Sequence, residues 1–168
     1  MANNLYLIGM PGAGKTLVGR IAAKKARTDF FDVDAGIAAK CGMSIPEIFE
    51  RFGEAYFRKI ESVVLSELSE RSGAVISCGG GAALFPENVA VMKRTGMIVL
   101  IDRDLKLIAK TADFGSRPLL RNGVPELEKL YGERGAVYHT VCDRVIENNS
   151  EAVSAAGALC GLIRGLSR

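Results

Sequence analysis

The sequence has little of the residues that build disulfide frameworks and metal centres. Its 168 residues include four cysteines, one histidine and no tryptophan. The cysteines are widely spaced and form no CxxC pair, so neither a zinc site nor a set of disulfides is predicted. The single histidine, His139, is interpreted as a surface or structural residue. We interpret the four thiols as buried or idle: Cys41, Cys78, Cys142 and Cys160.

Long apolar runs and a strong excess of one charge are also absent. No apolar run reaches the roughly 18 residues that suggest a membrane span. The first residues, M-A-N-N, carry no basic segment typical of a signal peptide. The formal net charge is +3, and lysine and arginine form no stripe that would favour nucleic acid binding. We therefore expect a cytoplasmic protein that binds neither membranes nor nucleic acids.

What the sequence does contain is typical of one globular domain spanning residues 1–168, with 48% apolar and 24% charged residues. Short apolar runs alternate with segments of helical periodicity. The predicted strands are 4–8, 29–33, 74–78, 97–101 and 144–147. The predicted helices are 16–25, 45–52 after an S-I-P-E capping box, 54–71, 87–94, 105–111, 125–141 and 151–166. This alternation predicts an α/β fold in which helices cover both faces of a parallel sheet.

A phosphate-binding loop is predicted between the first strand and the first helix. Residues 9–16 read G-M-P-G-A-G-K-T and fit the pattern G-x-x-x-x-G-K-[ST]. The glycines let backbone N–H groups approach phosphate oxygens, and the N-terminus of the following helix attracts the same anion. Lys15 is predicted to contact the β- and γ-phosphates, and the Thr16 hydroxyl to bind Mg²⁺. A chance match in a glycine-rich turn is disfavoured, because a strand precedes the motif and a helix follows it.

Two carboxylates, Asp32 and Asp34, stand at the end of the second predicted strand. Residues two apart on a strand face the same side, and ligands of such folds bind beyond the carboxyl ends of the strands. We therefore expect both side chains in the site. One is suited to completing a Mg²⁺ shell through water, and the other to orienting an attacking hydroxyl or taking its proton. Taken alone, the D-x-D pattern is also compatible with two exposed loop acids.

Three arginines are candidates for binding anions. Arg58 lies one helical turn before Glu61, which is close enough to hold its guanidinium group. Arg117 lies in the polar segment 112–122, which predicts a mobile loop, and Arg134 lies in a predicted helix. If they converge, they can bind a carboxylate with the bidentate geometry that lysine lacks. Each arginine alone would be an ordinary surface charge.

Three consecutive glycines, residues 79–81, directly follow the third predicted strand. Their position indicates a ligand that approaches the backbone closely, although a permissive loop is the simpler alternative. Four aromatic residues, for which core packing is the default interpretation, are candidates for packing near that ligand: Phe49, Tyr56, Phe57 and Tyr131.

Together these segments resemble the shikimate kinase family, over about residues 5–148. The phosphate loop is shared by very many proteins. The other matching segments, in this order and spacing, are far more specific. They are F-D-x-D at 31–34, G-x-S-I-x-x-I-F at 42–49, G-E-x-x-F-R-x-x-E at 53–61, G-G-G at 79–81, R-P-L-L at 117–120 and R-x-x-x-Y at 134–138.

The resemblance implies a three-layer α/β/α architecture, with a five-stranded parallel sheet of the nucleoside monophosphate kinase type among P-loop NTPases. It implies transfer of the γ-phosphate of ATP to the 3-hydroxyl of shikimate, in aromatic amino-acid biosynthesis. It further implies substrate-binding helices at about 34–62, a lid at about 112–122, and a monomer. Shikimate is a small anion with several hydroxyls, so arginines at one end and a carboxylate at the other suit its chemistry.

The resemblance also assigns roles residue by residue. The implied catalytic residues are Lys15, Asp34 and Arg117. The implied ATP-binding residues are Gly12, Ala13, Gly14, Lys15, Thr16, Leu17, Lys110 and Arg117. The implied shikimate-binding residues are Asp34, Arg58, Gly79, Gly80, Gly81, Arg117 and Arg134. The implied Mg²⁺ ligands are Thr16 and, through water, Asp32. Lys110 stands where the family often has an arginine that stacks on adenine, and no basic residue typical of the adenine site follows Asn149.

Three other interpretations remain open from the sequence. The chain could be another small-molecule kinase of the same fold, such as a gluconate or nucleotide kinase. It could be a nucleotide-sensing protein without activity, although Lys15, Thr16, Asp32 and Asp34 are all present. A nucleic-acid-binding protein is suggested only by the sequence pI of about 8.7.

Overall fold

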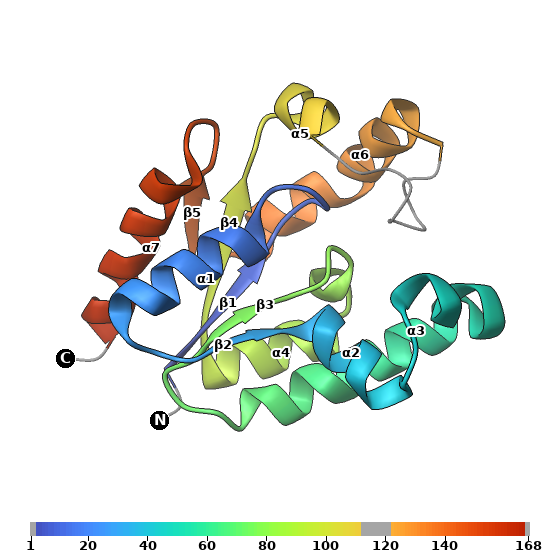
Figure 1. The fold of residues 1–168 in the computed structure, drawn as a ribbon, viewed down its shortest axis with the longest axis horizontal. Coiled ribbons are helices and arrows are strands. Elements are labelled where there is room, and N and C mark those ends of the chain that lie inside the picture. Colours follow the sequence, from blue (N-terminus) through green and yellow to red (C-terminus); the bar gives the residue numbers. More distant parts are fainter. Residues whose placement is uncertain (1–2, 112–121, 167–168) are drawn as a thin grey trace.

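The computed structural model describes residues 3–111 and 122–166, and five parallel strands form its central sheet (Figure 1). The strand order is β2-β3-β1-β4-β5. All four pairings are parallel, which confirms the predicted α/β fold. The strands are β1 (Asn4–Ile8), β2 (Phe30–Asp32), β3 (Val75–Ser77), β4 (Gly96–Asp102) and β5 (Arg144–Glu147).

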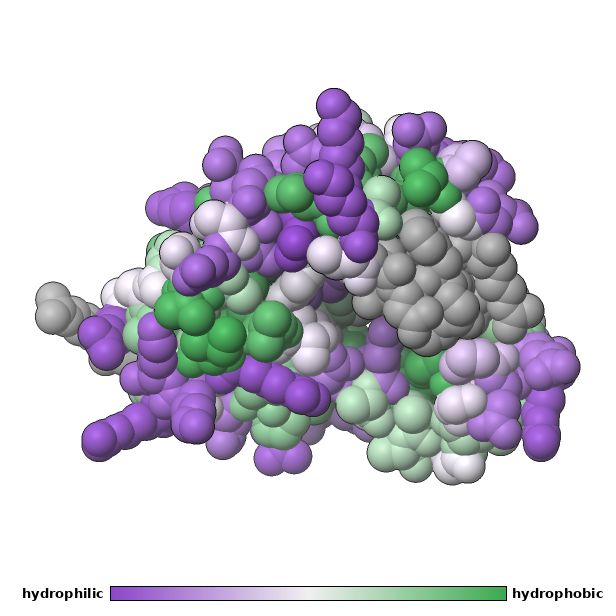
Figure 2. Space-filling model, turned by 45° about the horizontal axis from the view of Figure 1, so that its top comes forward, coloured by the Kyte–Doolittle hydropathy of each residue, from purple (hydrophilic) through white to green (hydrophobic). Residues whose placement is uncertain are grey.

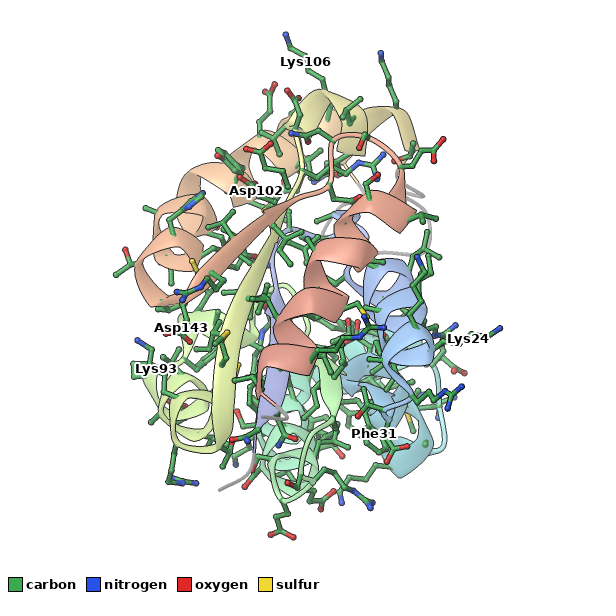
Figure 3. All side chains as sticks on the ribbon, turned by 90° about the vertical axis from the view of Figure 1, so that its left-hand side faces the viewer. Lys24, Phe31, Lys93, Asp102, Lys106 and Asp143 are labelled. Carbon is green, nitrogen blue, oxygen red and sulfur yellow. The ribbon has the colours of Figure 1, made fainter. Side chains whose placement is uncertain are left out.

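Helices cover both faces of this sheet. In Figure 1, α1 and α7 lie side by side in front of the sheet, and in Figure 3, seen from the side, α4 and α6 lie on the opposite face. The helices are α1 (Lys15–Ala26), α2 (Val33–Cys41), α3 (Ile45–Ser69), α4 (Pro86–Thr95), α5 (Leu105–Thr111), α6 (Val124–Val141) and α7 (Ala152–Leu166), and a 3-10 turn, η1 (Ala82–Leu84), follows β3. In the described part of the chain, none of these helices combines the length and apolar character needed to cross a membrane.

The core lies between the sheet and its two helical layers. Strand β1 is buried along its whole length, and β4 is buried from Ile98 to Ile101. A parallel sheet covered on both faces requires such continuous apolar strands. This explains why a short apolar run predicted β1 at its observed bounds. Strand β5 also has its predicted bounds, although only Ile146 in it is buried.

The second predicted strand, 29–33, ends one residue early. Asp32 closes β2 and is also the N-cap of α2, because its Oδ1 accepts a hydrogen bond from the Ala35 N–H at 3.2 Å. Helix α2, which the sequence pattern did not predict at Val33–Cys41, then begins directly. The expectation that Asp32 and Asp34 share one face of a strand is therefore wrong, since Asp34 lies in the first turn of a helix.

Helix α3 begins with the predicted capping box. Its helical conformation is interrupted at the predicted boundary between two helices. The Ser44 side chain accepts from the Glu47 N–H, and Glu47 accepts in return from the Ser44 N–H. Gly53, with φ 79° and ψ 174°, interrupts the helical conformation between the two predicted helices, 45–52 and 54–71. The positive φ favours glycine at this position.

Candidate active site

A cavity of about 520 Å³ lies at the carboxyl ends of the strands. Figure 2 turns this edge of the molecule toward the viewer and shows it hollowed near the middle. The volume is within the range of ligand pockets. Its walls come from the β1–α1 loop, the end of β2, α3, the loop after β3, and α6. The sequence analysis predicted that ligands bind at this edge of the sheet.

The β1–α1 loop forms one wall of the cavity as a phosphate cradle. Gly9 and Gly14 have φ of 140° and 93°. A Cβ at Gly9 would lie 2.5 Å from the Ile101 carbonyl oxygen, so the loop rests directly on the end of β4. Buried Lys15 donates from Nζ to the carbonyl oxygens of Gly9 and Met10, at 2.8 and 2.9 Å. These contacts hold a positive charge at the start of α1, where the helix N-terminus already favours anions.

Three oxygen-bearing side chains meet beside the cradle. The Thr16 Oγ1 donates to Asp32 Oδ2 at 2.7 Å and lies 3.3 Å from Ser77 Oγ. Ser77 was not predicted, but Asp32 and Ser77 are register partners at the ends of adjacent strands. Hydroxyl and carboxylate oxygens suit Mg²⁺, which binds few protein ligands and retains several waters. This donor set therefore fits Mg²⁺, although residues 3–111 and 122–166 hold no group of three or more His, Cys, Asp or Glu suited to a metal.

Arg58 is held at the opposite side of the cavity by two glutamates of its own helix. Its Nη1 donates to Glu61 Oε2 at 2.8 Å, and its Nη2 and Nε donate to Glu54 Oε1 at 3.0 and 3.3 Å. The predicted support of Arg58 by Glu61 is confirmed. Two carboxylates restrict the guanidinium group to one orientation, which reduces the entropy lost when it binds an anion.

The structure brings Arg134 close to Arg58 through the glycine run. A Cβ at Gly81 would lie 2.5 Å from the Arg58 guanidinium atoms, and a Cβ at Gly80 would lie 3.3 Å from Arg134 Nη1. Arg134 is only 4% exposed, and its Nε has no hydrogen-bond partner among the described residues. The guanidinium groups of Arg58 and Arg134 therefore lie next to the glycine run, which has no side chains, and face the same cavity. This arrangement favours a bound carboxylate.

Glu61 brings a buried carboxyl group to the same corner. It is 0% exposed, and a Cβ at Gly79 would overlap its Oε1 and lie 3.3 Å from Asp34 Oδ1. Burial raises the pKa of Glu61 above its ordinary value, the ion pair with Arg58 offsets part of this rise, and the nearby charge of Asp34 adds to it. A side chain at position 79 would therefore displace the Glu61 carboxylate, which favours glycine there.

Tyr138 fixes the glycine run from the side of α6. Its buried hydroxyl donates to the Gly80 carbonyl oxygen, and burial raises the pKa of this phenol, so it stays protonated as a donor. In a planar trans peptide the next N–H points away from the carbonyl. The bond to Tyr138 therefore turns the Gly81 N–H away from α6.

Other lining residues include both predicted and unexpected side chains. Phe49 and Phe57 form an apolar wall, with ring centroids 4.7 Å apart, whereas Tyr56 and Tyr131 lie outside the lining. Cys78 also lines the cavity, but burial raises the pKa of its thiol, which keeps it uncharged. A neutral thiol is a poor nucleophile. No motif in the sequence predicted Cys78 in the site.

The remaining predicted ATP-site residues have different positions. Gly12, Gly14, Lys15, Thr16 and Leu17 line the cavity, and Leu17 is 56% exposed at its rim. Ala13 is buried behind the loop. Lys110 lies on the exposed face of α5 and is not part of the lining, unlike its neighbour Thr111. Arg117, with residues 112–121, lies outside the described residues.

Comparison with known proteins gives one consistent family. The model of the shikimate kinase family matches residues 11–159. A shikimate kinase from Clostridium beijerinckii is 39% identical over 151 residues, which cover 90% of this chain and 89% of that protein. The structure of a shikimate kinase from Acinetobacter baumannii in complex with shikimate has a TM-score of 0.91 and 37% identity, covering 98% of this chain and 94% of that one. The Aquifex aeolicus shikimate kinase structure gives a TM-score of 0.83 and 34% identity, covering 98% of both chains.

Proposed function

The chain belongs to the shikimate kinase family, and from this premise we propose that it transfers the γ-phosphoryl group of ATP to the 3-hydroxyl of shikimate. It is a kinase of the shikimate pathway that uses ATP as its co-substrate. The observation that carries the choice of acceptor is the pair of guanidinium groups, Arg58 and Arg134, set against the glycine run in the cavity that begins at the phosphate loop.

In this proposal the shikimate carboxylate lies between Arg58 and Arg134. Both guanidinium groups are largely withdrawn from water, so charge-assisted hydrogen bonds to a carboxylate are strong there. The N–H groups of Gly80 and Gly81 supply further donors, and Phe49 and Phe57 pack against the ring of the acceptor. Fixing the acid end of the ring orients the hydroxyls at its other end.

Asp34 is proposed to act on the attacking hydroxyl. Its carboxylate accepts the proton of the 3-hydroxyl while that oxygen bonds to the γ-phosphorus and the bond from phosphorus to the β,γ-bridging oxygen breaks, which releases ADP. Asp34 lines the cavity between the phosphate cradle and the glycine run. The alternative role, in which Asp34 only positions the hydroxyl, predicts a smaller loss when its charge is removed.

The phosphate side is proposed to bind ATP through Gly12, Gly14, Lys15 and Leu17, with Ala13 supporting the loop. Lys15 would leave the carbonyl oxygens of Gly9 and Met10 for the β- and γ-phosphates. Thr16, and Asp32 through water, would hold Mg²⁺, whose charge, when the ion is bound, offsets the negative charge of the phosphates. Positioning and neutralisation of charge are the main requirements of phosphoryl transfer.

The resemblance supports the remaining assignments. Arg117 would neutralise charge on the transferring group from a lid at about 112–122, and Lys110 would contact adenine. On the same basis we propose a monomer. We also propose that the enzyme works in the cytoplasm, where ATP is available, without nucleic acid or membrane partners.

The experiment that tests this function measures ADP release from ATP and Mg²⁺ with shikimate, gluconate, AMP or no acceptor, and identifies the phosphorylated position of the product by NMR. We expect rapid release with shikimate alone and phosphate on the 3-oxygen. Faster turnover of gluconate or AMP, or phosphate on another oxygen, would contradict the proposed acceptor.

A further inference from the structure

Asn148 joins two distant parts of the chain at the phosphate loop. It is the first residue after β5 and is only 1% exposed. Its Nδ2 donates to the Ala13 carbonyl oxygen at 2.8 Å, across 135 positions of sequence. A Cβ built on Gly14 would lie 2.5 Å from the same Nδ2. The side-chain amide of Asn148 therefore packs directly against the peptide that joins Ala13 to Gly14.

This contact fixes the direction of one peptide plane in the cradle. The carbonyl of Ala13 and the N–H of Gly14 belong to the same planar peptide and point in opposite directions. Asn148 binds the carbonyl from the side of β5, so the Gly14 N–H is turned away from Asn148. Gly14 lines the cavity and directly precedes α1, where N–H groups have no partner within the helix. From these contacts we propose that Asn148 is a positioning residue, which orients the Gly14 N–H toward the phosphates of the nucleotide.

Asn148 is itself held rigidly by the sheet. Its backbone N–H donates to the Asp102 carbonyl oxygen at 2.7 Å, directly after the last register pair of β4 and β5, Asp102 and Glu147. Figure 3 labels Asp102 at the end of β4, beside the strand that leads into α7. The phosphate loop also rests on β4 through Gly9 and Ile101. Strands β4 and β5 thus hold the loop at both of its ends.

The amide of Asn148 is poorly explained as a device for stability alone. Its Oδ1 is buried and has no hydrogen-bond partner among the described residues. A buried acceptor without a partner costs free energy that an apolar side chain would not. The hydrogen bond that the side chain donates to the Ala13 carbonyl oxygen is directed at the phosphate loop, which fits a positioning role.

The inference rests on the proposed function in one respect, that this loop binds the phosphates of a nucleotide. The test compares two variants of Asn148 with a matched control. Asn148→Asp replaces the donor by a carboxylate facing the Ala13 carbonyl, and Asn148→Ala removes the donor without adding charge. The control is Asn149→Asp, the same change one residue later. Asn149 is exposed, and its Oδ1 accepts from the Asp104 N–H at 2.8 Å, which a carboxylate can also do.

Calorimetry with ADP, and separately with shikimate, gives the decisive readout for the full-length protein. We expect Kd for ADP to rise about tenfold in Asn148→Asp and at least about threefold in Asn148→Ala, the loss of one hydrogen bond. The Kd for shikimate should stay within about twofold of wild type in both variants, because a phosphate-loop peptide does not contact the acceptor. The control should match wild type for both ligands. If Asn148 had only a structural role, its substitution would weaken the binding of ADP and of shikimate to a similar extent.

Three outcomes would overturn the positioning role. They are unchanged ADP binding in Asn148→Ala, equal weakening of ADP and shikimate, and an effect of Asn149→Asp as large as that of Asn148→Asp. A wild-type protein that binds ADP without phosphorylating shikimate would instead overturn the proposed function and leave this test valid. A wild-type protein that binds no ADP would overturn both.

Discussion

Most of the site's chemistry resides in charged side chains that are withdrawn from water. Lys15, Glu61 and Arg134 are all buried. Burial of a charge is costly unless the charge is paired or hydrogen-bonded. Glu61 is paired with Arg58, and Lys15 is bonded to backbone carbonyls. A phosphate and a carboxylate are therefore well matched to this cavity, because each brings negative charge to a cation whose hydration is already lost.

The first prediction at the residue scale concerns the attacking hydroxyl. Asp34→Asn is expected to lower kcat by about 10² to 10⁴, the usual contribution of a general base, while KM for ATP stays near the wild-type value. Steady-state kinetics with shikimate measure both. The control is Asp29→Asn, an exposed aspartate just before β2. Unchanged turnover in Asp34→Asn would remove the proton-accepting role.

The second prediction concerns the pH dependence of folding stability. Burial raises the pKa of Glu61 above its ordinary value of 4.5, so the folded protein binds this proton more tightly than the unfolded chain does. The stability that Glu61 contributes is therefore complete below 4.5 and is lost as the pH rises through its folded-state pKa. Glutamine does not titrate, so the stability of Glu61→Gln relative to wild type should rise as the pH increases from about 4 to about 8.

Denaturant unfolding across this pH range measures the effect. The slope against pH is the test, because the constant difference between the two proteins also contains the lost ion pair with Arg58. Glu128→Gln, at an exposed position of α6, is the control and should give no comparable slope. A relative stability that is flat or that falls with rising pH would contradict the assigned direction.

At the scale of elements, the glycine run after β3 decides how closely the arginines approach the backbone. Gly81 has φ −97° and ψ −7°, which alanine also adopts, but its Cβ would lie 2.5 Å from the Arg58 guanidinium. Gly81→Ala is therefore expected to displace Arg58 and raise KM for shikimate by about ten- to a hundredfold, with KM for ATP nearly unchanged.

A matched glycine on α7 controls for the substitution itself. Gly157 is exposed, and a Cβ there would meet nothing within 4 Å. Gly157→Ala should leave both KM values unchanged and raise helix stability by about 0.5 to 1 kcal/mol. The same kinetics assay measures both variants. An unchanged KM for shikimate in Gly81→Ala would show that the guanidinium group is not held against the backbone.

The helices also show which structural features can be predicted from the local sequence. The capping box at Ser44 and the break at Gly53 were predictable, because each depends on residues within one helical turn. Helix α2 was not predictable from the local pattern, since its apolar residues form no clear stripe and only the cap at Asp32 marks its start, although the resemblance implied helices from about residue 34. That omission led to the wrong backbone conformation for Asp34, although both aspartates do line the cavity as expected.

At the scale of the whole molecule, the strand order places the site. The parallel order β2-β3-β1-β4-β5 brings the ends of β1, β2 and β3 together, so the phosphate loop, Asp32 and the glycine run meet at one edge. Alternating strands and helices predicted the sheet, and the motifs predicted its ligand-binding edge. The contacts of Ser77 and Asn148 depend on partners 61 and 135 positions away, which no local pattern encodes.

The most direct measurement is ADP release by the wild-type enzyme with shikimate, with its methyl ester and with no acceptor. The ester keeps every hydroxyl but lacks the carboxylate charge. Two charge-assisted hydrogen bonds lost at Arg58 and Arg134 predict a kcat/KM at least about 100-fold lower for the ester than for shikimate, and little release without an acceptor. Equal turnover of the acid and the ester, or ADP release that is independent of shikimate, would contradict the account.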